Sequence, residues 1–442
     1  MTKSILTRRR LLQATLTAGA AHALPTPFGT PARATAAGQA AAPFRVAVIG
    51  HTGRGNYGHQ LDTLWGQLPP ELATVVAVAD ADADGLSAAT GRLGLPADAG
   101  FQDYRAMLAE VRPDVVSIAP RHIDQHHAMA IAAAEAGAAG IYMEKPFCRD
   151  LVEADAIVEA CRASNTKLAL AHRNRYHPVL PVVARLIEEG AIGRLLELRG
   201  RGKEDHRGGG LDLWVLGSHV FDLALGFAGQ PLACSAHIQQ DGRPATAADV
   251  FEGDEGVGPL VGDQIHARFE MEAGVPLFFD SIKEAAPRGA PFGLQLVGTG
   301  GIIDLRVDLE PLVHLMEGNP FVPAPELRRW VPVTSAGVDQ PEPVADIRHQ
   351  IGGHGAAVRD LFAAIREDRA PLCGAIEGRT VVAMTMAVFE SHRHGGARVA
   401  LPQPSGPNPL AGWQQARSVA PATVGRAVPG EPRSQDGRGG WG

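Results

Sequence analysis

The chain of 442 residues has few cysteines and few aromatic residues, and its charge is nearly balanced. The four cysteines, at positions 148, 161, 234 and 373, form neither a CxxC pair nor a dense framework, so buried thiols are expected rather than disulfides or metal ligands. A net charge of -7 without a basic block in the body argues against nucleic acid as the main partner. What is present, 45% hydrophobic and 20% charged residues, is typical of a soluble globular protein of about two domains.

Both ends of the chain are predicted to lie outside the folded body. Thr7-Arg8-Arg9-Arg10-Leu11-Leu12, an alanine-rich run and Ala21-His22-Ala23 resemble a twin-arginine export signal over residues 1–23, too short to span a membrane. An ordinary Sec signal and a weakly basic amphipathic arm are the alternatives. The export signal predicts a periplasmic or extracellular protein. Residues 24–43 read as a linker and residues 403–442 as a disordered tail.

A glycine-rich loop follows the first apolar run of the body, residues 44–49, which is typical of a buried parallel strand. Gly50-x-Thr52-x-x-Gly55 has the spacing of a dinucleotide-binding fingerprint with threonine in the middle, whereas a register from Gly53 to Gly58 starts too far from the strand. The first register predicts a helix that begins near Gly55. The candidate cofactor-binding residues of this loop are Gly50, Thr52, Gly53, Arg54, Gly55 and Asn56.

A carboxylate ends the second apolar run, residues 74–79. Asp80 lies about two dozen residues beyond the glycines, near the spacing expected for a ribose ligand. A carboxylate there would repel a 2′-phosphate, so NAD is favoured over NADP. The alternative for Asp80 is a helix N-cap, a role that Asp82 or Asp84 could equally fill.

The alternation of strands and helices continues to residue 171. Helices are expected at 104–111, 126–136 and 151–163, and strands at 114–119, 141–145 and 167–171. This order predicts an α/β doubly wound parallel sheet. Pro120 and His126, at the start of one helix, are candidate cofactor-binding residues. No carboxylate or cysteine joins the histidines at 122, 126 and 127 at ligand spacing, so no metal site is predicted.

The tripeptide Glu144-Lys145-Pro146 ends the strand at 141–145. Proline disfavours helical geometry at Lys145, which is therefore delivered at the carboxyl end of a parallel strand, where ligands bind. Adjacent strand residues point to opposite faces, so Glu144 and Lys145 can serve two partners, for instance cofactor and substrate. A surface charge pair before a turn is the alternative.

Together these segments resemble the Gfo/Idh/MocA oxidoreductase family. The resemblance covers most of residues 44–402 and is carried by the glycine loop, Asp80, Ala119-Pro120, Glu144-Lys145-Pro146 and Arg173-Asn174-Arg175-Tyr176-His177-Pro178. It implies a Rossmann domain, here 44–173, and an α+β domain, here 174–402, built on a large open mixed β-sheet that serves substrate binding and often homo-oligomerisation. Strand patterns at 195–201, 264–271, 275–282, 294–298 and 302–307 agree with it.

A second polar cluster lies between Gly208 and Asp222. A helix over residues 212–225 would place Asp212, Val215, His219 and Asp222 on one face. By the resemblance, Lys145 and His219 match the family's catalytic lysine and histidine, whereas Val215 stands where the family usually has aspartate. Asp212 is either a substitute for that aspartate or a helix N-cap.

Three further side chains are assigned to the substrate site. Asp222 is expected to fix the tautomer of His219, although a satisfied core histidine remains an alternative. Arg175 and Tyr176 are positioned to bind substrate hydroxyls, or else to pack between the domains.

Oxidation of a carbinol carbon needs a hydride acceptor and a base. NAD supplies the first, and a partly desolvated Lys145 beside a cationic nicotinamide supplies the second, while His219 could take or relay the proton. The sequence therefore predicts an exported oxidoreductase that acts on a sugar, polyol or glycoside and holds its NAD tightly, since no nicotinamide pool exists outside the cytoplasm. The alternatives are a redox-neutral enzyme that oxidises a glycoside transiently and a sugar-binding protein without turnover.

Overall fold

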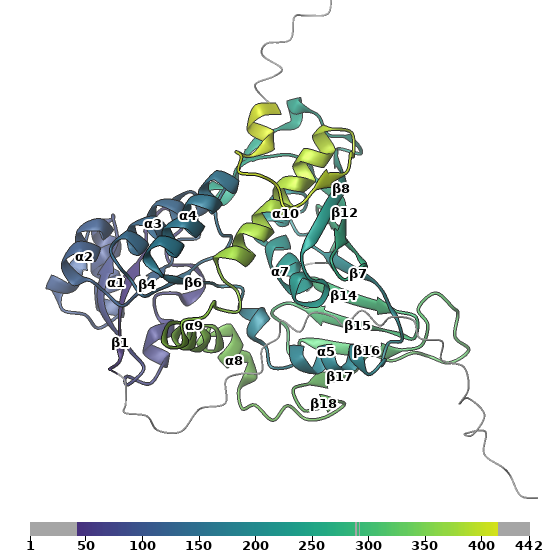
Figure 1. The fold of residues 1–442 in the computed structure, drawn as a ribbon, viewed down its shortest axis with the longest axis horizontal. Helices are drawn as coiled ribbons and strands as arrows, with labels where there is room; N and C mark the ends of the chain where they lie inside the picture. The colour runs from purple at the N-terminus through teal and green to yellow at the C-terminus, as the bar shows by residue number, and fades with distance from the viewer. Residues whose placement is uncertain (1–41, 288–289, 291, 414–442) are drawn as a thin grey trace, which may run out of the picture.

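The computed structural model describes residues 42–287, 290 and 292–413, folded around two β-sheets (Figure 1). Helices α7 (Gly217–Ala228) and α10 (Ala375–Arg393) lie between the two sheets. The predicted export signal and nearly all of the predicted linker lie outside the described residues, as does the tail from residue 414. Within the described ranges, no helix is both long and apolar enough to cross a membrane.

Six parallel strands form the first sheet, in the order β3-β2-β1-β4-β5-β6. Their bounds are β1 (Phe44–Ile49), β2 (Ala73–Ala79), β3 (Gly100–Phe101), β4 (Val115–Ile118), β5 (Gly140–Met143) and β6 (Lys167–Leu170). The continuous apolar runs of the sequence are buried here on both faces, which is why they contain no alternation. The predicted doubly wound sheet is confirmed, and its strand order reverses direction between β1 and β4, where ligands of such sheets bind.

The helices of this half are α1 (Ala83–Arg92), α2 (Tyr104–Val111), α3 (His126–Glu135) and α4 (Leu151–Ser164). The helix predicted to begin near Gly55 is wrong, because only two 3₁₀ turns, Gly58–Gln60 and Leu64–Gln67, connect β1 to β2. Asn56, His59 and Gln60 have positive φ angles, which a right-handed α-helix excludes.

An 11-stranded mixed sheet dominates the second half, as predicted. Its order is β18-β17-β16-β15-β14-β7-β13-β12-β8-β19, with β9 paired to β8, and only the β7–β13 pair is parallel. The strands are β7 (Leu195–Arg201), β8 (Pro231–Gln240), β9 (Arg243–Pro244), β12 (Gln264–Met271), β13 (Pro276–Ile282), β14 (Gly293–Gly298), β15 (Gly301–Arg306), β16 (Val313–Glu317), β17 (Val331–Thr334), β18 (Gly337–Val338) and β19 (Val399–Ala400). A separate hairpin pairs β10 (Phe251–Gly253) with β11 (Gly258–Leu260). Helix α5 (Leu180–Glu188) links the two halves.

The chain returns to the first sheet after the second one is complete. Helix α9 (Gly355–Glu367), preceded by α8 (Ile347–Gly352), lies under the first sheet in Figure 1. Val358, Leu361 and Phe362 of α9 belong to the same buried cluster as β1 and β2 residues, and the Phe362 ring stacks on Phe44 at 4.4 Å. The ordered body also extends past residue 402, since Leu410 is fully buried.

Candidate active site

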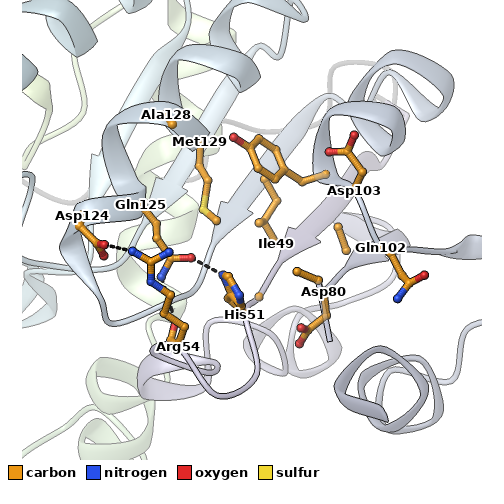
Figure 2. Close-up of a pocket in the computed structure, with 14 residues that line it drawn as sticks. Ile49, His51, Arg54, Asp80, Gln102, Asp103, Asp124, Gln125, Ala128 and Met129 are labelled. Atoms are coloured by element: carbon orange, nitrogen blue, oxygen red, sulfur yellow. Dashed lines mark hydrogen bonds and ion pairs between the residues drawn. The ribbon is translucent and has the colours of Figure 1, made fainter. Parts of the chain in front are cut away.

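A cavity of about 420 Å³ opens at the carboxyl ends of β1 and β2 (Figure 2). One wall is apolar, with Ile49 and Met129, and the opposite side carries two polar pairs. Arg54 forms an ion pair with Asp124, and His51 hydrogen-bonds Gln125. The remaining lining residues are Gly50, Ala79, Asp80, Ala81, Gln102, Asp103, Tyr104 and Ala128. Its position beside the strand-order reversal and its apolar wall suit the adenosine half of a dinucleotide.

The glycine loop is packed closely against its own chain. A Cβ atom on Gly50 would lie 2.0 Å from the Tyr57 ring, and one on Gly55 would lie 2.6 Å from the backbone nitrogen of His122. Gly55 also has a φ of +90°, which other residues rarely adopt. Within the loop, the Asn56 side chain accepts a hydrogen bond from the Gly53 amide at 2.9 Å. The spacing of the glycines therefore reflects close contacts of the loop with itself and with the segment after β4.

Asp80, the predicted ribose ligand, is fully buried and bound by protein donors. Its carboxylate accepts hydrogen bonds from the Thr52 amide at 3.0 Å, the Thr52 hydroxyl at 2.8 Å and the Tyr57 hydroxyl at 2.9 Å. The Asp82 amide donates a fourth, at 3.0 Å. The N-cap of α1 is Asp82, not Asp80.

Glu144 and Lys145 face different partners beyond the end of β5. Glu144 is fully buried and lies 3.0 Å from Nδ1 of His59. Burial alone would raise the pKa of Glu144, but the hydrogen bond and charge of His59 and the charge of Lys145 lower the pKa to about 2. The Lys145 amine donates a hydrogen bond to the Val215 carbonyl at 3.2 Å, and burial lowers the pKa of Lys145 even though Glu144 opposes the shift.

A break between two helices creates the acceptor for Lys145. The predicted single helix over 212–225 is wrong: α6 (Gly210–Val215) ends before Leu216, and α7 follows. In a continuous helix the Val215 carbonyl would accept the amide of His219, which instead bonds the Leu216 carbonyl at 3.1 Å. The Val215 carbonyl is thus available to Lys145, at the position where the family resemblance expects an aspartate side chain.

His219 lies beside Lys145 and is neutral at ordinary pH. Burial, followed by the charge of Lys145, places the pKa of His219 well below its usual value. Its Nδ1 has no hydrogen-bond partner among the described residues. Asp222 does not orient this ring, as the sequence suggested, because its carboxylate accepts from the Cys373 thiol at 3.1 Å and lies 3.6 Å from Arg175.

Sequence reasoning missed His172, which lies two residues past the end of β6, the last strand of the first sheet. Its ring lies 5.1 Å from that of His219, and its Nδ1 is 3.5 Å from the Cys373 sulfur. A polar residue just past the carboxyl end of a buried strand was the available signal. The potential metal-ligand atoms of His172, Asp222 and Cys373 lie within 4.8 Å of one another. We do not assign a metal site to them, because the Arg175 guanidinium already balances the charge of Asp222 and the Cys373 thiol donates a hydrogen bond to the Asp222 carboxylate.

Asp212 holds a loop rather than a helix end. Its carboxylate accepts hydrogen bonds from the amides of Lys203 and Glu204, at 3.2 and 3.1 Å, and from the Ser281 hydroxyl at 2.6 Å. The N-cap of α6 is Gly209, so the predicted capping role of Asp212 is wrong. Burial raises the pKa of Asp212 despite these three donors.

The remaining candidates connect parts of the fold. The Arg175 guanidinium donates to the Asp222 carbonyl, and the Tyr176 hydroxyl accepts from the Cys373 amide at 3.2 Å. His126 places one ring nitrogen 2.7 Å from the Pro120 carbonyl and the other 2.8 Å from that of Pro146. The His126 contacts tie the segments after β4 and β5 together, and the Arg175 contact ties the segment after β6 to α7.

Comparisons with known proteins agree with this geometry. Residues 44–172 match the Gfo/Idh/MocA family, described as an oxidoreductase family with an NAD-binding Rossmann fold. Levoglucosan dehydrogenase of Pseudarthrobacter phenanthrenivorans is 28% identical over 259 residues, 53% of this chain and 65% of the relative. D-apiose dehydrogenase of Paraburkholderia graminis is 36% identical over 121 residues, 27% of this chain and 31% of the relative. Each match thus spans less than two thirds of the relative's length.

The fold as a whole is also known. A levoglucosan dehydrogenase structure in complex with NADH and levoglucosan superimposes with a TM-score of 0.63 at 23% identity, over 82% of this chain and 100% of that one. At this identity the likeness concerns the two-domain fold. Residues 44–172 are thus similar to the Gfo/Idh/MocA oxidoreductase family over the length of a Rossmann domain.

Proposed function

We propose that this protein is an NAD-dependent oxidoreductase that removes a hydride from a carbinol carbon of a sugar, polyol or glycoside. The observation that carries the proposal is the approach of Lys145, from beyond the end of β5, to the break between α6 and α7, where its amine bonds the Val215 carbonyl and its charge lowers the pKa of His219. A cavity that suits the adenosine half of a dinucleotide lies two strands away, at β1 and β2. The relatives named for levoglucosan and D-apiose support a carbohydrate substrate.

The residues present fit an NAD-dependent reaction. NAD, when bound, would accept the hydride, with Ile49 and Met129 offering an apolar wall to its adenosine half. Lys145 takes the hydroxyl proton at Nζ, because burial lowers the pKa of its amine and so raises the fraction of neutral amine at the working pH. The Val215 carbonyl orients that amine. A neutral His219 hydrogen-bonds the substrate hydroxyl and leaves the proton transfer to Lys145.

A substrate panel with NAD tests this proposal. Levoglucosan, D-apiose and common aldoses, polyols and methyl glycosides are each supplied to the purified protein, and NADH absorbance and product are followed together. A net oxidoreductase reduces its nicotinamide as it forms product, to at most about one equivalent per chain if the cofactor is retained, whereas a redox-neutral enzyme forms product at constant NADH. If the protein turned over no member of the panel, with either NAD or NADP, the proposed activity would be refuted.

We also propose that the protein is exported by the twin-arginine route with its NAD already bound. The support is the Thr7–Leu12 motif and the scarcity of nicotinamide outside the cytoplasm. Protein purified without added cofactor should then release nearly one nicotinamide nucleotide per chain on denaturation, and added NAD should barely stimulate it. An empty protein that needs free NAD for every turnover would contradict retention. A homo-oligomer through the second sheet stays a prediction, which light scattering can check.

A further inference from the structure

The Asp80 carboxylate has no capacity left for a ligand. An ionised carboxylate offers about four lone-pair sites. Four donor groups already occupy them: the Thr52 amide, the Thr52 hydroxyl, the Tyr57 hydroxyl and the Asp82 amide, all between 2.8 and 3.1 Å. A ribose hydroxyl could bind Asp80 only by displacing one of them.

Asp80 is also buried, although it borders the cavity. Its exposed fraction is 0%, and Figure 2 shows its carboxylate turned away from Ile49 and Met129. The Tyr57 ring fills the space over Gly50, where an added Cβ would lie 2.0 Å from it. Burial and the neighbouring Asp80 charge raise the pKa of Tyr57, so its hydroxyl stays protonated and donates. Asp80, Thr52 and Tyr57 thus form a closed hydrogen-bonded unit that fixes the glycine loop to the end of β2.

A second carboxylate lines the same cavity and is accessible. Asp103 lies just past the end of β3, the strand next to β2, and is exposed. Its Oδ1 caps α2 by accepting from the Arg105 amide at 2.9 Å, while Oδ2 has no hydrogen-bond partner within the part of the chain that the structure describes. Gln102, also exposed, stands beside it on the same wall.

We propose that Asp80 anchors the glycine loop and that Asp103 is the carboxylate that recognises the ribose of NAD and excludes the 2′-phosphate of NADP. The proposal rests on the proposed NAD-dependent function and names the residue that sets its cofactor specificity. Asp103 has the free acceptor oxygen that a ribose hydroxyl requires, and its charge repels a phosphate.

Matched substitutions separate the two carboxylates. Asp103→Asn keeps the helix cap, since asparagine caps as well as aspartate, and removes only the charge. Affinities for NAD and NADP are measured by titration calorimetry at fixed salt for the wild type, Asp103→Asn and Asp80→Asn. We expect Asp103→Asn to lower the preference for NAD over NADP by about tenfold or more, the scale of one charge–phosphate contact. Asp80→Asn should weaken both nucleotides by the same factor. The opposite pattern, in which only Asp80→Asn changes the preference, would overturn the proposal.

Amide hydrogen exchange of the nucleotide-free protein tests the anchor without any ligand. Asp80→Asn and Tyr57→Phe should each speed exchange of the Thr52 amide at least several-fold, whereas Asp103→Asn should leave it unchanged. Unaltered Thr52 exchange in Asp80→Asn would refute the anchoring role, whatever the nucleotide data show. If the nucleotide-stripped wild type bound neither nucleotide, the assignment of Asp103 would fall together with the proposed function, and the exchange result would still decide the role of Asp80.

Discussion

Replacing Lys145 by methionine removes the proposed base while keeping the length and apolar stem of the side chain. A positioned acid or base contributes about 100-fold to 10,000-fold to turnover. The variant should therefore lose at least about 100-fold in kcat, which corresponds to about 2.7 kcal/mol of transition-state stabilisation. Folding should not suffer. Burial disfavours the charged amine, and the 3.2 Å contact to the Val215 carbonyl is the only hydrogen bond that the amine would lose among the described residues.

Lys167→Met is the matched control. Lys167 lies at the start of β6, and its amine pairs with the largely exposed Asp368 at 2.7 Å, far from the end of β5 that carries Lys145. A surface pair of this kind contributes at most about 1 kcal/mol to stability, and turnover should be unchanged. Comparing the two variants separates the loss of the base from the general loss of a lysine.

The pH dependence supplies the decisive readout. The neutral amine is the base, so kcat/KM should rise with pH and level off, with a midpoint below the ordinary lysine pKa of 10.5 because burial lowers the pKa of Lys145. Steady-state rates across the pH range, with the nucleotide content of each variant measured alongside, provide the test. If Lys145→Met kept near-normal turnover and the same rising limb, the assignment of Lys145 as the base would be refuted.

Two further outcomes follow from other buried groups. Asp212→Asn should lower the free energy of unfolding by about 1 to 3 kcal/mol in denaturant titration, because the substitution disturbs an acceptor of three hydrogen bonds. The kcat of the folded variant should stay unchanged. A large loss of kcat without a loss of stability would instead make Asp212 catalytic. Burial lowers the pKa of His354 to about 3, and the ring is hydrogen-bonded to the Tyr142 hydroxyl at 2.6 Å. The contribution of neutral His354 to the stability of the fold is therefore complete above pH 6.5 and is lost as the pH falls from there towards 3. Stability should fall by up to about 1.4 kcal/mol per pH unit in that window, and His354→Asn should flatten the slope; equal slopes in the two proteins would contradict this.

The strands of the first sheet could be predicted well, because the residues that determine each strand are neighbours in the sequence. The run at 44–49 coincides with β1, and the strand at 74–79 misses only one residue of β2. Apolar residues without alternation are needed wherever a parallel strand is covered on both faces. The same holds for the strands of the second sheet at 195–201 and 264–271, where alternation is visible and both ranges match the structure.

The failures arose where contacts distant in sequence decide local structure. The pattern over 212–225 suits one helix, and only Gly217 hinted at the break after Val215. The partner of Asp222 proved to be Cys373, 151 residues away, which no spacing rule could indicate. Asp80 had the position of a ribose ligand, but the two side chains that occupy it come from the loop itself. A sequence motif gives the position of a residue along the chain, but it does not indicate which neighbouring side chains will form hydrogen bonds with that residue.

The return of α9 to the first sheet has a consequence for dissecting this protein. A fragment that ends near residue 172 would contain the whole dinucleotide-binding motif and all six strands, yet it would leave uncovered the apolar face on which Val358, Leu361 and Phe362 pack. Such a fragment would aggregate or stay unfolded unless α9 were supplied in trans or fused to its end. An exchange of this domain for that of another protein therefore has to include two separate stretches of this chain, the first sheet with its helices and α9. The chain between these two stretches must be long enough to let α9 reach the first sheet.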